Sequence, residues 1–204
     1  FYASSHAAQG DVTVLNKLSP IFVTLLAAVF MKEKLSPIQI PALVLSVLGA
    51  FIVFRPSFQS DPFPLIGALH SAITSGIAYT FLGYFKGQVD GITVIMHFST
   101  FSVFGSLPFV IGNFVMPDLR QFLLLMLISL FGSFGQVFIT YAYPFATASE
   151  ISIYNYSGIL FSILLGAVVL GEPVKHTSIL GGALVAIASI MVYIYGNSKK
   201  KEAK

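Results

Sequence analysis

The sequence predicts an all-helical integral membrane protein, because of its composition and the length of its apolar segments. Of the 204 residues, 56% are hydrophobic and 9% are charged, whereas charged residues make up about a quarter of a typical soluble domain. The apolar segments are about 20 residues long, which is the length at which a helix crosses the hydrocarbon core. They are about twice as long as a membrane-barrel strand and lack the alternation of such strands, so helices are predicted.

Seven apolar segments are predicted to cross the membrane, with short polar turns between them. Typical turn sequences are KEKLSP at 32–37, KGQVDG at 86–91 and GEPVKH at 171–176. The chain opens on FYASSHAAQG, which we expect to be the end of an earlier helix of a longer protein. The predicted spans are 9–31, 37–55, 63–86, 91–114, 120–143, 148–170 and 177–196.

Lysine and arginine residues in the short loops predict that the carboxyl terminus is cytoplasmic, because positive loops stay on that side. The tail KKKEAK is expected to lie against anionic lipid and not to bind nucleic acid. The opposite side of the membrane holds Arg55, Arg120 and Lys175. The side of the carboxyl terminus holds Lys32, Lys34, Lys86, Lys199, Lys200, Lys201 and Lys204.

A gapless repeat relates residues 1–53 to residues 140–192, at an offset of 139 residues. It pairs the first predicted span with the sixth, and the second with the seventh. A unit that recurs after five crossings, an odd number, has the opposite orientation in the membrane, as in the inverted repeats of secondary transporters. The repeat predicts two five-helix repeats and ten helices in the full-length parent, of which this chain holds about seven complete spans and a helix stub. The polar matches are Asn16 with Asn155, Glu33 with Glu172, and Asp11 with Glu150.

Polar residues within the predicted spans are candidate binding residues. An ionisable residue at the centre of a span costs about 2.5–3.5 kcal/mol, and Lys17 lies about 4.5 Å from the middle of the first span. At 100° per residue Lys17 shares a stripe with Thr13 and Asn16, whereas Asp11 points away and is expected at an interface or surface. The predicted substrate-binding residues are Lys17, Asn16, Thr13, Asn155, Tyr156 and Gln136.

These residues also have structural interpretations. Lys17 is alternatively an internal strut, hydrogen-bonded to backbone carbonyls or to Tyr156. Pro20 has no amide hydrogen, so it is predicted to kink the first span and to free the carbonyl of Asn16 as a contact for substrate or water. The alternative is that Pro20 simply shapes the packing of the helix. His70 and His97 are candidate proton-relay residues, or alternatively buried histidines held by hydrogen bonds.

The sequence lacks the motifs of the enzyme classes that work at membranes. It has no Gly-x-x-x-x-Gly-Lys-Ser/Thr loop for ATP, no His-Glu-x-x-His motif and no Gly-x-Ser-x-Gly motif. Its four histidines are scattered and it has no cysteine, so neither a metal site nor thiol chemistry is predicted. We therefore expect no enzyme activity and no cofactor.

Two parts of the sequence resemble EamA-type members of the drug/metabolite transporter superfamily. LSPIFVTLLAAVFMKEKLS at 18–36 with PALVLSVLGAFIVFRP at 41–56 is similar to the end of their first repeat. ISIYNYSGILFSILLGAVVLGEPV at 151–174 with ILGGALVAIASIMVY at 179–193 is similar to the end of their second repeat. The resemblance implies this division of the chain: 1–56 as the stub and last two helices of the first repeat, 57–62 as the loop between repeats, 63–196 as the five-helix second repeat, and 197–204 as a cytoplasmic basic tail.

The resemblance also implies a function. Members of the family are multi-pass permeases of the cell membrane that move small metabolites, usually outward in efflux, through a cavity between the repeats. Alternating access without ATP hydrolysis is expected, with a small-molecule metabolite and the lipid bilayer as partners; a homodimer is left open. The alternative is a non-transporting membrane scaffold, in which the polar stripes are buried dry against other helices.

Overall fold

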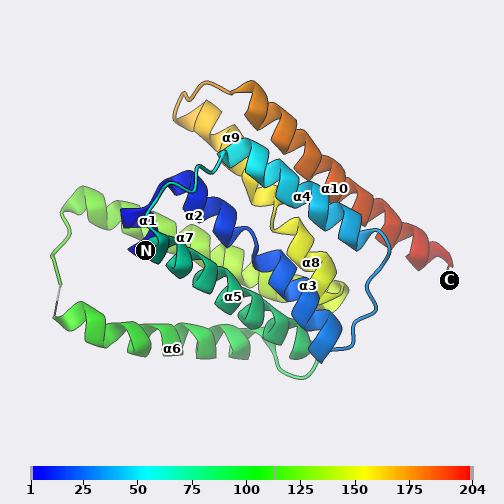
Figure 1. Cartoon of the computed structure of the whole chain (residues 1–204). Coiled ribbons are helices and arrows are strands. Elements are labelled where there is room, and N and C mark those ends of the chain that lie inside the picture. The colour runs from blue at the N-terminus through cyan, green and yellow to red at the C-terminus, as the bar shows by residue number, and fades with distance from the viewer. Residues whose placement is uncertain (1, 113, 203–204) are drawn as a thin grey trace. The chain divides into compact units, whose positions relative to one another are not determined.

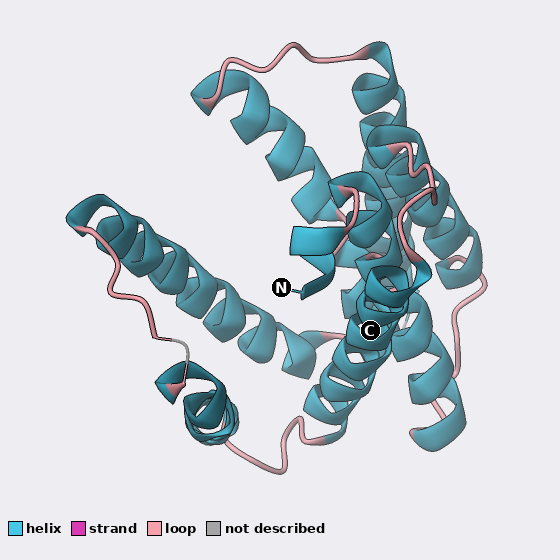
Figure 2. Ribbon diagram, turned by 60° about the vertical axis from the view of Figure 1, so that its left-hand side comes forward, coloured by secondary structure: helices cyan, strands magenta, loops and turns pink. Residues whose placement is uncertain are grey.

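The computed structural model describes residues 2–112 and 114–202, without the side chains of residues 197 and 199–202. Within this part the structure consists of helices joined by loops (Figures 1 and 2), which confirms the predicted all-helical fold. The chain forms two compact units, Phe1–Phe81 with Thr147–Lys204 and Leu82–Ala146. Residue 113 of the predicted span 91–114, and residues 203–204 of the predicted tail, lie outside the description.

The first unit is built around α4 and α10, which pack along each other (Figure 1). Their backbones come close at two glycines: a Cβ atom added to Gly49 would lie 2.6 Å from the carbonyl oxygen of Gly181. Buried residues of α8 and α9, among them Ile153 and Ile159, complete this core. The helices of the unit are α1 (Tyr2–His6), α2 (Gln9–Asn16), α3 (Ser19–Phe30), α4 (Gln39–Phe54), most of α5 (Pro62–Tyr84), α8 (Ala148–Tyr154), α9 (Ser157–Val169) and α10 (His176–Glu202).

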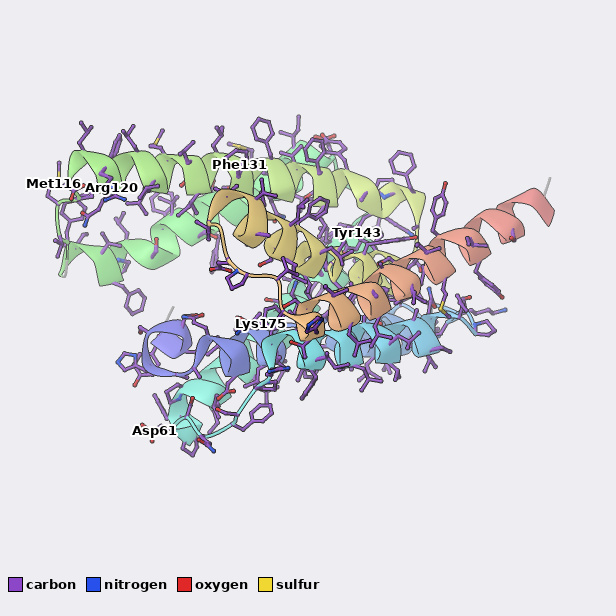
Figure 3. The ribbon with its side chains drawn as sticks, turned by 90° about the horizontal axis from the view of Figure 1, so that it is seen from above. Asp61, Met116, Arg120, Phe131, Tyr143 and Lys175 are labelled. Carbon is purple, nitrogen blue, oxygen red and sulfur yellow. The ribbon has the colours of Figure 1, made fainter. Side chains whose placement is uncertain are left out.

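The second unit contains the end of α5, then α6 (Gly91–Ile111), α7 (Leu119–Ala142) and the short 3₁₀ helix η1 (Tyr143–Phe145). Aspartates fix the starts of both long helices. Asp90 accepts a hydrogen bond from the amide of Ile92, and Asp118 forms a capping box with Gln121. Large apolar side chains project all along α7 (Figure 3), including Phe131, which is 69% exposed. Such a surface suits contact with lipid.

Among the described residues, six helical segments are long and apolar enough to span a membrane, which confirms the predicted integral membrane class. The predicted span 37–55 corresponds to α4, whose 16 residues rise about 24 Å, and its crossing remains a prediction. α10 continues to Glu202, six residues past the predicted end of the last span at 196. The six segments are Gln9–Phe30, Pro62–Tyr84, Gly91–Ile111, Leu119–Phe145, Ala148–Val169 and His176–Gly196.

The first and sixth predicted spans are each interrupted near the middle, between α2 and α3 and between α8 and α9 (Figure 1). At the kink predicted near Pro20 the helix is interrupted for two residues, because α2 ends at Asn16 and α3 begins at Ser19. Pro20 is the second residue of α3, where its missing amide hydrogen breaks no bond within the helix. The predicted span 148–170 corresponds to the segment Ala148–Val169. Its interruption was not predicted: α8 ends at Tyr154 and α9 begins at Ser157, without a proline between them.

Candidate binding site at the helix interruptions

The two interruptions lie against each other and exchange hydrogen bonds. The Nζ atom of Lys17 donates to the carbonyl oxygen of Asn155 at 3.1 Å. The hydroxyl of Tyr156 donates to the carbonyl oxygen of Lys17 at 2.6 Å. Each side chain therefore satisfies a backbone carbonyl at the interruption of the other helix.

Both carbonyls are available because the backbone shifts to shorter turns at the interruptions. The amide of Ile159 bonds to Tyr156 and not to Asn155, and the amide of Ile21 bonds to Leu18 and not to Lys17. A carbonyl left without its helical donor inside a membrane is costly unless another group pairs with it. The ammonium group and the phenol hydroxyl supply these missing donors.

Lys17 is half-buried and lies over a glycine. A Cβ atom on Gly158 would lie 3.6 Å from the Nζ atom, so the absence of a side chain there leaves room beside the charge. Among the described residues, Nζ bonds only to the Asn155 carbonyl and no carboxylate pairs with it. An ammonium group has three N–H donors, so two remain for a ligand. The carbonyl bond is what the strut interpretation requires, and the two remaining donors are what anion binding requires.

Of the other predicted binding residues, four belong to the first unit with Lys17, and Gln136 belongs to the second unit. Asn16 is exposed, whereas Thr13 and Asn155 are half-buried. Tyr156 is fully buried, and its hydroxyl is occupied by the Lys17 carbonyl. Gln136 belongs to the second unit, where its Nε2 atom donates to Thr140 Oγ1 at 3.5 Å. Substrate contact by each of these residues remains a prediction.

The two histidines lie on different units. His70 on α5 is exposed, and its backbone carbonyl accepts a hydrogen bond from Thr74. His97 on α6 is also exposed, and its Nδ1 atom lies 2.9 Å from the carbonyl oxygen of Thr93. A proton-relay role for either residue remains a prediction. No group of three or more His, Cys, Asp or Glu side chains in the described part could hold a metal ion.

Asp11 faces the loop after α4 and not the polar stripe. It is 1% exposed and accepts hydrogen bonds from the Ser57 amide at 2.6 Å and the Ser60 hydroxyl at 3.1 Å. Of the two positions expected for Asp11, an interface or the surface, the structure shows the first: its carboxylate is buried between α2 and the loop after α4. The sequence did not reveal the two serines, because they lie about 50 positions away in a polar loop that resembles any other turn.

Sequence reasoning also missed the partners of Glu33. Its carboxylate accepts hydrogen bonds from the amides of Ala148 and Ser149, at 2.9 and 3.3 Å, and from the Ser149 hydroxyl at 3.0 Å. The only sequence signal was the match of Glu33 with Glu172 in the repeat. Backbone amides leave no mark in the sequence, so the contact could not be predicted from residue types.

The chain matches known proteins over most of its length. The model of the EamA-like transporter family matches residues 1–55 and 62–194. The pseudopaline exporter CntI of Pseudomonas aeruginosa (strain UCBPP-PA14) is 29% identical over 192 residues, which cover 93% of this chain and 68% of the exporter. Solute carrier family 35 member G1 of Homo sapiens is 26% identical over 215 residues, covering 93% of this chain and 56% of the human protein.

A crystal structure with 15% sequence identity matches the fold with a TM-score of 0.80, over 96% of this chain and 71% of that one. The family match extends over both interrupted helices, over α4, over α10 as far as residue 194, and over the whole second unit. The resemblance to EamA-type proteins of the drug/metabolite transporter superfamily is thereby confirmed, and the chain belongs to the EamA-like transporter family.

Proposed function

We propose that the full-length protein is a secondary transporter that exports small metabolites by alternating access, without ATP hydrolysis. The family and the named relatives are transporters, and one of them is named as an exporter. The observation that carries the proposal is the paired interruption of two helices, with the Lys17 ammonium group between them. Interrupted helices near the middle of the membrane form the substrate sites of many secondary transporters, because they present unpaired backbone groups and helix ends.

The inverted-repeat arrangement is part of this proposal. Backbone features at the 139-residue offset support it: Lys32 and Gly171 both have positive φ, at 54° and 68°. The residues that follow make matching bonds, because the Glu33 amide donates to Ala27 and the Glu172 amide donates to Gly166, both at 3.1 Å. The division of the chain at 57–62, the ten-helix parent and the cytoplasmic carboxyl terminus belong to the same proposal.

The chemistry around Lys17 favours an anionic substrate. A cation in a membrane span is stabilised by a negative partner, and the described residues supply none. In our proposal Lys17 pairs with a carboxylate or phosphate of the metabolite. Asn16, Thr13, Asn155 and Gln136 supply further hydrogen bonds, Tyr156 holds the interruption in place, and His70 and His97 are the candidates for proton coupling.

Uptake by proteoliposomes containing the full-length parent tests the proposal. The probes are radiolabelled small carboxylates and phosphates, with neutral and cationic metabolites for comparison. Transport should favour anions, need no ATP, and be lost in Lys17→Ala but kept in Lys175→Ala, which removes an exposed lysine from the loop before α10 (Figure 3). Equal transport by Lys17→Ala and the parent would refute the charge-pairing role. Absence of uptake for every probe class would favour the scaffold alternative.

A further inference from the structure

Glu33 fastens the loop between α3 and α4 to the start of α8. Its two carboxylate oxygens accept hydrogen bonds from the amides of Ala148 and Ser149. These are the first two residues of α8, and their N–H groups have no partner within the helix. Negative charge is also stabilised at a helix N-terminus. Beside this contact the Nε2 atom of Gln39 donates to Thr147 Oγ1 at 3.3 Å. We call the contact of Glu33 with Ala148 and Ser149 the inner latch, because it lies at the end of the unit that is predicted to face the cytoplasm.

The equivalent contact at the other end of the first unit is not made. Glu172 occupies the equivalent position in the repeat. Its backbone amide donates to the Gly166 carbonyl, as the Glu33 amide donates to the Ala27 carbonyl. Its carboxylate is exposed and, among the described residues, has no hydrogen-bond partner; Oε2 lies 2.9 Å from where a Cβ on Gly166 would be. Ala8, which precedes α2, provides no side-chain cap for the helix, and its own amide donates to the Ser60 hydroxyl at 3.0 Å.

Helix packing shows the same asymmetry. α3 packs firmly against α8, whereas the repeat-related helices α9 and α2 make no comparable contact within the described residues. The unit is therefore closed at the end where α3 finishes and α8 begins, which we call the inner end. It is not closed in this way at the outer end, where α9 finishes and α2 begins. Two ends related by a repeat thus occupy different states in one structure.

We propose that Glu33 is the gate residue that holds the inner end closed, and that Glu172 makes the equivalent contact with the first amides of α2 when the inner end opens. This inference rests on the alternating access proposed above. In this proposal the two carboxylates contact the helix starts and not the substrate, so they hold the helices in position. In the inner-closed state only Glu33 makes its charge-assisted contact, and in the outer-closed state only Glu172 does.

The two closures are unequal in strength. The inner latch is reinforced by side chains that its counterpart at the outer end lacks, because the serine and threonine at the start of α8 correspond to glycine and alanine at the start of α2. We therefore expect the inner-closed state to be the more populated one in the absence of substrate. The pairs at the 139-residue offset are Ser149 with Gly10, Thr147 with Ala8, and Gln39 with Ser178.

Cysteine labelling tests the latch without knowledge of the substrate. The chain contains no cysteine, so the full-length protein, with any cysteine outside this chain replaced, receives one reporter, Ser152→Cys. Ser152 is fully buried and lies one turn beyond the latch. A charged, membrane-impermeant maleimide is applied to each face of sealed vesicles, and the labelling rate is compared between the parent, Glu33→Ala, Glu172→Ala and Asp61→Asn. Asp61 is an exposed loop carboxylate (Figure 3) and serves as the control.

Glu33→Ala should raise the labelling rate from the inner face roughly tenfold or more, the population change expected when charge-assisted hydrogen bonds are lost. Glu172→Ala should not raise it, because it removes a contact that favours the inner-open state, and Asp61→Asn should match the parent. Unchanged labelling in Glu33→Ala would overturn the proposal, as would equal increases in both glutamate variants. If Glu33→Ala fails to fold, Glu33→Gln, which keeps one acceptor oxygen, should give a smaller increase.

The outcomes separate the latch from the transport function. Faster labelling in Glu33→Ala, with no uptake of any probe by the parent, would support the latch and refute transport. Uptake by the parent, with unchanged labelling in Glu33→Ala, would refute the latch alone.

Discussion

Replacement of Lys17 by methionine separates its binding role from its structural role. Methionine is similarly long and flexible, but it loses the 3.1 Å bond from Nζ to the Asn155 carbonyl. A hydrogen bond from a charged group contributes about 1.5–3 kcal/mol. The substitution also removes a cation whose placement in a membrane span costs about 2.5–3.5 kcal/mol. The two terms nearly cancel, so the free energy of unfolding should change by less than about 1 kcal/mol.

Transport should respond differently, because the substrate loses its charge partner. The pairing of an anion with Lys17 is of the same order as a charged hydrogen bond, so uptake of an anionic substrate should fall at least about tenfold. Thermal unfolding in detergent and uptake in proteoliposomes, measured on the same preparations, check both halves. A stable variant that transports like the parent would refute the binding role. Loss of stability by several kcal/mol would show instead that Lys17 is chiefly a strut.

Three further predictions concern contacts and packing within the first unit, each measured by thermal unfolding in detergent. Tyr156→Phe leaves a buried backbone carbonyl without its donor and should lower the free energy of unfolding by about 1–3 kcal/mol. Asp11→Ala should lower the free energy of unfolding by about 3 kcal/mol, because it loses every hydrogen bond of a buried carboxylate. Ser60→Ala loses only one of these bonds and should lower it by about 1 kcal/mol. Equal losses in the two variants would contradict this reasoning. Gly49→Ala should destabilise by about 1–3 kcal/mol through a clash with the backbone of α10, whereas Gly67→Ala, in open space on α5, should be neutral or slightly stabilising.

The helices could be predicted from sequence because length and apolar composition are local properties. The first interruption was also predictable, since Pro20 removes a helical hydrogen bond wherever it sits within a span. The second was not, because nothing between Tyr154 and Ser157 disfavours a helix. It is stabilised by Lys17, 138 positions earlier, which supplies the hydrogen bond that the Asn155 carbonyl loses. A break that depends on a distant donor leaves no local sequence signal.

The candidate site was predictable where a side chain is unusual for its surroundings. Lys17 is such a residue, and the polar stripe identified it. Asn155 was predicted through its side chain, yet the structure uses its backbone carbonyl. Glu33 stood out only as a match within the repeat, because its partners are two amides and a hydroxyl that carry no recognisable pattern. The strut interpretation included a bond from Lys17 to backbone carbonyls, but the sequence did not identify which residues supply the backbone groups in either contact.

The contact between Lys17 and Tyr156 has a geometric consequence in the proposed arrangement. The two residues occupy equivalent positions in the repeat, 139 residues apart, and each bonds to the helix interruption of the other. Two positions related by a two-fold axis can touch only close to that axis. Lys17 therefore lies where rocking of one repeat against the other moves the chain least, and Glu33 and Glu172 lie near the ends, where it moves the chain most. A substrate held by Lys17 would keep its partner in both states, while the carboxylates at the ends exchange theirs.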